Sequence, residues 1–175
     1  MDLKPLIRDV PDFPQAGILF RDITPLLADP AAFAFVLDAL QEDAERRRPG
    51  AIVGIESRGF VFGAPLSHRM GLPFVPVRKP GKLPAARMSV EYSLEYGTNQ
   101  LDIHEDALVP GTRAYIVDDL LATGGTARAA AKLVELIRGT VAGFGFVVEL
   151  RHLQGRAELS GYDVFSVVQY QEAAP

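Results

Sequence analysis

Apolar residues recur at helical spacing in three stretches of the chain. Within 33–44 they occupy positions i, i+3, i+4, i+7 and i+11, which is the pattern of one face of an amphipathic helix. Asp29 stands where a helix cap belongs, and a Pro-Gly pair at 49–50 is placed to end the helix. Similar spacing over 59–70 and 126–138 predicts two further helices.

Short runs of nearly continuous apolar, β-forming residues alternate with these helices. Such runs indicate buried strands of a mostly parallel sheet whose two faces are both covered. We therefore predict an α/β fold, with a mostly parallel twisted sheet and helices on both faces, as a single domain over 1–175. The predicted strands cover 51–55, 74–77, 114–117, 144–150 and 164–168.

The stretch 78–96 interrupts this alternation. Four cations lie within ten residues with no acid among them, prolines and a glycine are interleaved, and 88–96 alternates like the arm of a hairpin. Taken alone, this basic segment is either a solvated surface loop or part of an anion site. The cations are Arg78, Lys79, Lys82 and Arg87.

Composition limits the chemistry that the domain can carry. The absence of cysteine among the 175 residues excludes disulfides, thiolate metal sites and a cysteine nucleophile, and it favours the cytoplasm. The formal charge of −4 argues against a protein that coats nucleic acid, so any anion needs a local site. We expect no membrane partner, because no stretch has the length of a signal peptide core or a bilayer span. His68, His104 and His152 match no metal-ligand spacing.

The segment that follows the predicted strand at 114–117 is the clearest candidate site. Asp118 and Asp119 follow the strand, and Thr-Gly-Gly-Thr at 123–126 then opens a helix. The glycines let the backbone approach a ligand, and the free N–H groups of the helix start can bind a phosphate. Carboxylates fit beside that phosphate if the ligand also carries ribose hydroxyls or a Mg²⁺. A plain tight turn with aspartate caps is the alternative, but the order of these parts favours the phosphate site.

The run “VDDLLATGGT” at 117–126 resembles the phosphoribosyl diphosphate (PRPP) signature of type I phosphoribosyltransferases, and its double leucine resembles the adenine-specific family. Five other blocks are similar to that family in order and spacing, so the resemblance covers almost the whole chain. It implies the type I phosphoribosyltransferase fold, with a small N-terminal hood over 1–30 and a mobile hairpin lid over 79–98. The five blocks are “PDFPQAGILFRDITPLLADP” at 11–30, “ESRGFVFG” at 56–63, “RKPGKLP” at 78–84, “YSLEYG” at 92–97 and “VVELRHLQGR” at 147–156.

The activity that this resemblance implies is Mg²⁺-dependent transfer of the 5-phosphoribosyl group from PRPP to N9 of adenine. The resemblance also implies AMP and pyrophosphate as the products, a place in purine salvage, and a homodimeric enzyme. Two alternatives stay open: a 6-oxopurine phosphoribosyltransferase, and a non-catalytic regulator that senses PRPP. A regulator needs a DNA-binding appendage or a basic face, and a protein that only senses PRPP has no use for a proton-accepting Glu95.

The same resemblance assigns the PRPP-binding residues. Asp118 and Asp119 face the ribose hydroxyls and are the candidate protein ligands of a Mg²⁺ that is held mainly through the substrate. Arg58, Lys79 and Lys82 neutralise the leaving pyrophosphate. A pyrophosphate loop with a cis peptide bond is formed by Glu56, Ser57 and Arg58. The phosphate loop, which holds the 5′-phosphate, consists of Ala122, Thr123, Gly124, Gly125 and Thr126.

Proton transfer and lid closure are assigned to the block “YSLEYG”. Glu95 matches the carboxylate that takes the N9 proton, although without the resemblance it reads as an exposed strand glutamate. Tyr92 and Tyr96 cover the site when the lid closes and exclude water. Arg87 receives no role.

Recognition of adenine is assigned to the hood. Backbone groups near Leu19 and Arg21 supply an acceptor for the exocyclic amine and a donor for N1, a pattern that 6-oxopurines invert. Phe20 and Leu120 sandwich the ring. Without the resemblance, Phe20 reads equally well as a core residue.

Overall fold

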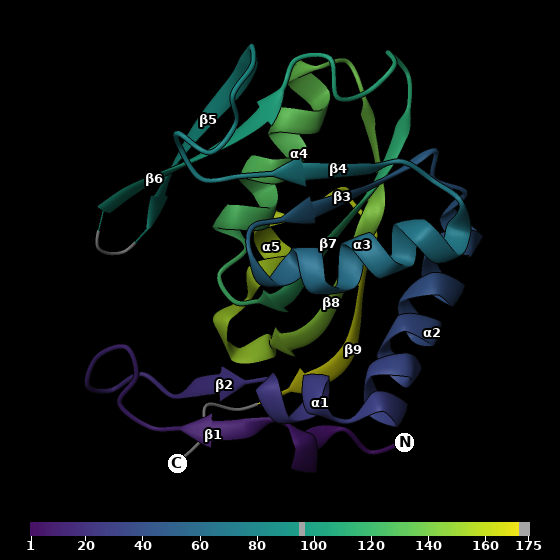
Figure 1. Cartoon of the computed structure of the whole chain (residues 1–175). Helices are drawn as coiled ribbons and strands as arrows, with labels where there is room; N and C mark the ends of the chain where they lie inside the picture. The colour runs from purple at the N-terminus through teal and green to yellow at the C-terminus, as the bar shows by residue number, and fades with distance from the viewer. Residues whose placement is uncertain (95–96, 172–175) are drawn as a thin grey trace.

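A five-stranded sheet forms the centre of the computed structural model, which describes residues 1–94 and 97–171 (Figure 1). The strand order is β4-β3-β7-β8-β9, and every neighbouring pair is parallel. The predicted mostly parallel sheet is therefore confirmed. Its strands are β3 (Ala51–Ile55), β4 (Phe74–Val77), β7 (Arg113–Leu121), β8 (Thr140–Leu150) and β9 (Val164–Tyr170).

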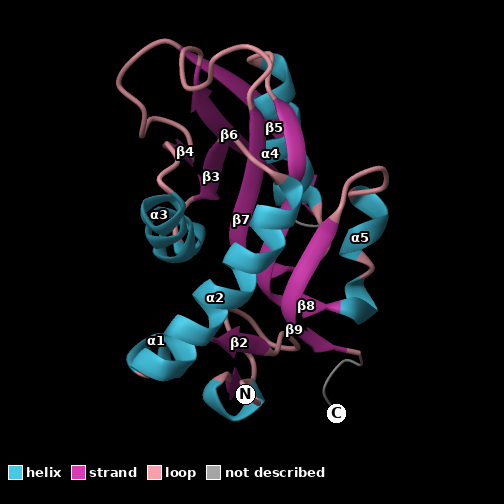
Figure 2. Ribbon diagram, turned by 90° about the vertical axis from the view of Figure 1, so that its right-hand side faces the viewer, coloured by secondary structure: helices cyan, strands magenta, loops and turns pink. Residues whose placement is uncertain are grey.

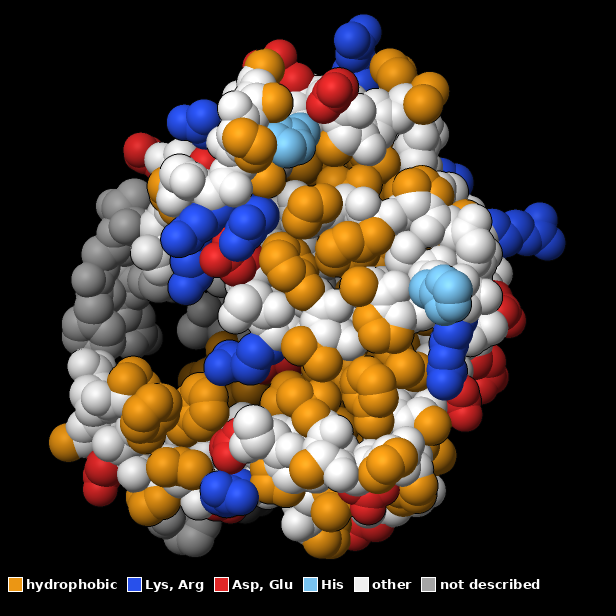
Figure 3. Space-filling model, viewed as in Figure 1, with side chains coloured by type: hydrophobic (Ala, Val, Ile, Leu, Met, Phe, Trp, Pro, Cys, Tyr) orange, Lys and Arg blue, Asp and Glu red, His pale blue; other side chains and the backbone are white. Residues whose placement is uncertain are grey.

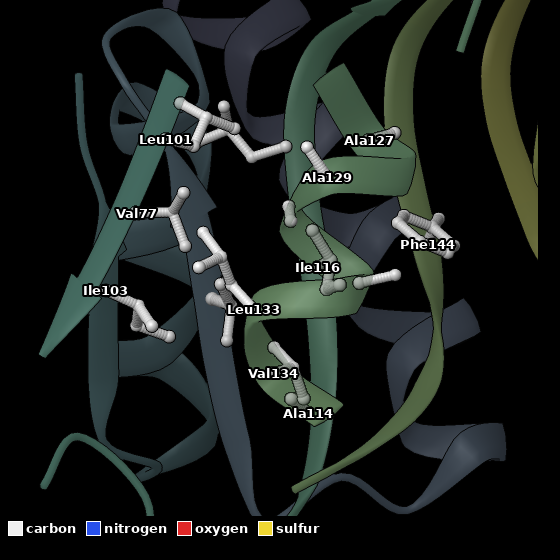
Figure 4. Packing of buried hydrophobic residues seen from close by; sticks show 14 of the residues in the cluster. Val77, Leu101, Ile103, Ala114, Ile116, Ala127, Ala129, Leu133, Val134 and Phe144 are labelled. Atoms are coloured by element: carbon white, nitrogen blue, oxygen red, sulfur yellow. The ribbon is translucent and has the colours of Figure 1, made fainter. Parts of the chain in front are cut away.

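Helices cover both faces of this sheet, as predicted (Figure 2). Alternate strand side chains point to opposite faces, so Ile52 packs with the helices of one face and Val53 with the helix of the other. In Figure 4, Leu133 of the second face lies between Ile116 of the sheet and Ile103 of a neighbouring hairpin. The first face carries α1 (Thr24–Ala28), α2 (Pro30–Arg47) and α3 (Arg58–Met70), and the second carries α4 (Gly125–Leu136).

Helix α2 begins as its sequence predicts. The Asp29 side chain accepts hydrogen bonds from the backbone N–H groups of Ala31 and Ala32, at 2.9 and 3.0 Å, and so satisfies two donors that have no partner within the helix. At the other end, Arg48 adopts the left-handed conformation that stops the helix. Among the described residues, no helix combines the length and the apolar character that a membrane crossing requires.

Two small antiparallel sheets flank the central sheet. Within residues 1–30, β1 (Arg8–Val10) pairs with β2 (Phe20–Asp22), after a short 3₁₀ helix, η1 (Lys4–Leu6). The hairpin consists of β5 (Arg87–Leu94) and β6 (Gly97–His104), which confirms the predicted hairpin arm. One of its faces belongs to the core, because Val90, Leu101 and Ile103 are buried against α4.

The end of β7 differs from the sequence prediction. The strand does not stop before Asp118 and Asp119 but continues to Leu121. It does so because β8 runs beside it over its whole length, with Asp118 opposite Phe146 and Leu121 opposite Glu149. The two aspartates therefore stand on a regular strand, whose geometry fixes them more firmly than a loop would.

A buried tyrosine ties α2 to the centre of the sheet. The hydroxyl of Tyr115 on β7 donates to Oδ2 of Asp43 at 2.8 Å, and both side chains are buried. Asp43 also accepts from Nε of Arg47 at 2.7 Å. The ring of Tyr115 has room only because residue 145 is glycine, since a Cβ there would lie 2.4 Å from the hydroxyl oxygen.

Changing Gly145→Ala is therefore expected to lower the free energy of unfolding by about 1–3 kcal/mol, the usual cost of adding a methyl group to a filled core. Urea unfolding measures the loss. In the double variant Gly145→Ala/Tyr115→Phe the clashing oxygen is gone, so the total cost should be smaller than the sum of the two single costs. Additive costs would contradict this account.

Candidate active site

A cavity of about 360 Å³ opens at the carboxyl ends of β3 and β7, where ligands of parallel α/β sheets commonly bind. Figure 3 shows a hollow in this part of the molecule, between the hairpin and the β1–β2 sheet. The structure brings together here most of the described residues predicted to bind PRPP. The cavity is lined by Glu56, Ser57, Arg58, Lys79, Tyr92, Asp118, Asp119, Leu120, Ala122, Thr123, Gly124, Gly125 and Thr126, with Asn99, Leu101, Leu121 and Ala127.

The phosphate loop enters helix α4 through a left-handed glycine. Gly124 has φ +90°, a conformation that side chains other than glycine rarely adopt. Within the described residues no side chain caps the helix start, so the N–H groups of its first turn remain available for a ligand. These groups and the positive end of the helix dipole favour an anion such as a phosphate.

The acid pair lies at one wall of the cavity with an arginine beside it. Asp119 is buried and accepts a hydrogen bond from Nε of Arg58. Asp118 accepts from the backbone N–H of Asp119 at 2.8 Å. Burial, with the Asp119 carboxylate next to it, raises the pKa of Asp118 well above its usual value. Two acids held this close repel each other when both are ionised, so they point to a ligand that uses both.

The pyrophosphate loop is joined to the basic segment by a carboxylate. Glu56 accepts from Nε of Arg78 and from the backbone N–H of Lys79, each at 3.0 Å. Burial alone would raise the pKa of Glu56, but these hydrogen bonds and the two positive charges hold it below its ordinary value. The Glu56–Ser57 peptide bond is cis, as the family resemblance implies. The loop therefore places the start of the basic segment at the cavity.

Comparison with known proteins identifies the family. The Phosphoribosyl transferase domain model matches residues 25–174. An adenine phosphoribosyltransferase of Synechococcus sp. is 58% identical over 97% of this chain and 99% of its own length. The chain belongs to the adenine phosphoribosyltransferase family.

Solved structures of this family have the same fold. The adenine phosphoribosyltransferase of Thermoanaerobacter pseudethanolicus is 54% identical, with a TM-score of 0.93 over 96% of this chain and 98% of its own. That of Saccharomyces cerevisiae, solved with D-2,5-dideoxy-2,5-imino-altritol 1,6-bisphosphate and adenine, is 41% identical, with a TM-score of 0.90 over 94% and 96% of the two chains.

The hood residues predicted to bind the base lie beside the cavity rather than in its wall. Phe20 faces the guanidinium of Arg58, which lies 5.3 Å from the centre of its ring. The Arg21 side chain is buried, pairs with Asp9 and stacks on Tyr170 at 3.9 Å, so Arg21 can offer a base only its backbone. Leu19, Phe20 and Arg21 do not line the cavity, whereas Leu120 does.

Three further predicted residues have different outcomes. Lys82 is exposed and does not line the cavity, and its carbonyl oxygen accepts from Nη1 of Arg78 at 3.4 Å. Glu95 and Tyr96, predicted for proton transfer and lid closure in this phosphoribosyltransferase, lie outside the described residues. Their roles stay predictions.

Sequence reasoning missed several residues of the site. Asn99 and Leu101 of β6 line the cavity. Asn99 pairs with Tyr92 across the hairpin, so a correct pairing of the two strands would have placed Asn99 beside a residue already predicted for the site. Arg87, which had no role, forms an ion pair with the buried Asp102 at 3.2 Å. Asp102 also accepts from Oγ of Ser89 at 2.8 Å, so this group fastens the base of the hairpin.

Few of the described side chains near the cavity could act as ligands of a metal ion. Among residues 1–94 and 97–171, no three His, Cys, Asp or Glu side chains gather to hold an ion. Asp118 and Asp119 supply oxygen donors at the cavity, which suits Mg²⁺ because it takes few protein ligands and keeps substrate and water oxygens. The residues therefore fit a Mg²⁺ that arrives with a diphosphate substrate.

Proposed function

We propose that this chain transfers the 5-phosphoribosyl group of PRPP to N9 of adenine, with Mg²⁺, and releases AMP and pyrophosphate as a step of purine salvage. The observation that carries the proposal is the cavity itself, because the free start of α4 and the acid pair Asp118 and Asp119 line it together. The helix start suits a phosphate monoester, and the carboxylates suit ribose hydroxyls. The names of the relatives, and the adenine in the yeast complex, support the same reaction.

That combination is specific in its chemistry. The acid pair at Asp118 and Asp119 and the start of α4 line the same cavity, so one ligand can meet both. A plain phosphate would be repelled by the carboxylates, whereas a ribose phosphate offers them hydroxyl donors. A phosphorylated ribose is therefore the ligand that this cavity fits best.

Each group predicted for the site then has a task in the transfer. The phosphate loop holds the 5′-phosphate, and the acid pair orients the ribose through its hydroxyls. As the bond from C1′ to the diphosphate oxygen breaks and the bond from N9 to C1′ forms, Arg58 and Lys79, with Lys82 of the basic segment, neutralise the departing charge. Glu95 takes the N9 proton. Asp118 and Asp119 would hold a Mg²⁺ together with substrate oxygens, and the bound ion would lower the charge of the diphosphate.

Adenine is recognised at the hood in this proposal. Phe20 stands next to Arg58, and Leu120 lines the cavity beside the acid pair, so these two side chains are the proposed sandwich for the purine ring. The ion pair between the buried Arg21 side chain and the exposed Asp9 holds the β2 backbone in place. Backbone groups near Leu19 and Arg21 then read the amino edge of the purine, and the lid residues Tyr92 and Tyr96 cover it.

We further propose that the enzyme is a cytoplasmic homodimer. Apolar side chains gather on the face on which α3 lies (Figure 3), and Val61 of that helix is 39% exposed. Exposed apolar groups that lie together are typical of a surface that a second protein chain covers. A cysteine-free chain suits a reducing compartment.

A substrate panel tests the proposed reaction. Purified protein with PRPP and Mg²⁺ should form AMP from adenine, and should form little or no nucleotide from hypoxanthine or guanine. Omission of PRPP or of Mg²⁺ should abolish the product. Turnover of hypoxanthine or guanine instead would favour the 6-oxopurine enzyme, and PRPP binding without turnover of any base would favour a sensor.

A further inference from the structure

The segment that follows β8 has no part in the chemistry described above, yet it touches the phosphate loop. After β8 ends at Leu150 come η2 (Arg151–Leu153) and the short helix α5 (Gly155–Glu158). A Cβ on Gly155 would lie 2.2 Å from the carbonyl oxygen of Ala122. The backbone of α5 is therefore in direct contact with the backbone of the phosphate loop.

This contact is reciprocal. A Cβ on Gly124, in the phosphate loop, would lie 2.4 Å from the carbonyl oxygen of Gly155 and 2.9 Å from Cβ of Glu158. Two glycines thus face each other across the contact, and a side chain on either of them would push the two segments apart. Gly155 itself does not line the cavity, so it meets the loop from outside the ligand site.

An ion pair fastens α5 to the central sheet. Arg156, next to Gly155, donates from Nε and Nη2 to the two carboxylate oxygens of Glu149, at 2.7 and 2.8 Å. The Glu149 side chain is only 3% exposed, and its residue pairs with Leu121 at the end of β7. Arg156 also donates from Nη1 to the carbonyl oxygen of Val164 at 2.9 Å. A bidentate pair of this kind fixes direction as well as distance.

The two observations combine into a support for the loop. Arg156 holds α5 on the sheet through its ion pair with Glu149 of β8 and its hydrogen bond to β9. The backbone of Gly155 is thereby kept in contact with the residues that precede α4. A binding loop loses affinity when it has to be ordered by its ligand, and support from a rigid neighbour removes that cost.

We propose that Gly155, held by the Glu149–Arg156 ion pair, is a positioning residue for the loop that binds the 5′-phosphate. The inference rests on the proposed function, because it takes the Ala122–Thr126 loop to bind that phosphate. It goes further in giving the segment “LQGR” at 153–156 a task, which is to set the loop in its binding conformation before the ligand arrives.

Calorimetric titration of Gly155→Ala with two ligands tests the inference. AMP carries the 5′-phosphate, and pyrophosphate with Mg²⁺ binds the other half of the site. We expect the variant to lose about tenfold or more in AMP affinity, which corresponds to about 1.4 kcal/mol, and to keep its pyrophosphate affinity within about twofold. The matched control is Ala157→Ser, an exposed change in the same helix, which should alter neither affinity.

A second variant serves if Gly155→Ala does not fold. Arg156→Gln removes the ion pair and adds no bulk at the loop, so it should lower AMP affinity in the same ligand-selective way, by a smaller factor. Unchanged AMP affinity in the folded variants would overturn the inference. Equal losses for AMP and pyrophosphate would also overturn it, because they indicate general structural damage. Wild-type protein that binds pyrophosphate but not AMP would contradict the proposed function itself.

Discussion

Replacing Asp118 and Asp119 together by asparagine is expected to weaken PRPP binding by roughly a hundredfold or more. Each carboxylate accepts hydrogen bonds from the ribose in the proposed complex, and hydrogen bonds to charged groups contribute about 1.5–3 kcal/mol each. Asparagine keeps the size of the side chain and loses the charge. Calorimetry with PRPP and Mg²⁺ measures the affinity directly.

The same double variant should be at least as stable as the wild-type protein. Burial and the Asp119 carboxylate raise the pKa of Asp118, which means that the folded protein resists ionising both acids. Neutral amides remove that repulsion. Arg58, which loses its partner Asp119, has a side chain that is 49% exposed, so water can solvate it. Urea unfolding should therefore give an equal or higher free energy of unfolding.

Weaker PRPP binding combined with undiminished stability separates a ligand-binding role from a structural one. The matched control is Asp106→Asn, an exposed change outside the cavity, which should leave PRPP affinity unaltered. If the double variant keeps wild-type affinity, the acid pair does not bind the ribose. If it is much less stable than wild type, the two aspartates are part of the framework of the fold.

Strand boundaries show which parts of the fold can be predicted from the sequence alone. The ends of β3 are predictable because all five of its residues are buried, so its apolar run and the strand coincide. The end of β7 is not predictable in this way. Asp118 and Asp119 read as polar residues after a strand, but the ladder with β8 carries β7 past them to Leu121. Tertiary pairing decides that boundary, and local polarity does not.

The site also has parts that the sequence predicts and parts that depend on tertiary structure. The phosphate loop and the pyrophosphate loop are each continuous in sequence, so a family resemblance finds them whole. Asn99 reaches the cavity only through the register of the hairpin, and Lys79 is held there by the bond from its backbone N–H to Glu56. Those positions depend on how distant segments meet. The support from Gly155 to Ala122 is of this second kind.

The second large effect is expected for Glu95→Gln. This change should lower kcat by about a hundredfold to ten-thousandfold, the usual contribution of a positioned acid or base. PRPP affinity should stay within about threefold, because glutamine keeps the size of the side chain and the proposed role is toward N9 of adenine. Glu91→Gln, an exposed change on β5, is the matched control and should keep wild-type kcat.

The measurement has to isolate the chemical step. When product release limits turnover, a slower proton transfer is partly hidden in the steady-state rate. Single-turnover formation of AMP from enzyme-bound PRPP avoids this, because it reports the transfer before any product leaves. A loss in the single-turnover rate that Glu91→Gln does not share would assign the proton transfer to Glu95. An unchanged single-turnover rate would leave N9 to lose its proton to water or to another group, and Glu95 would then have no part in the chemistry.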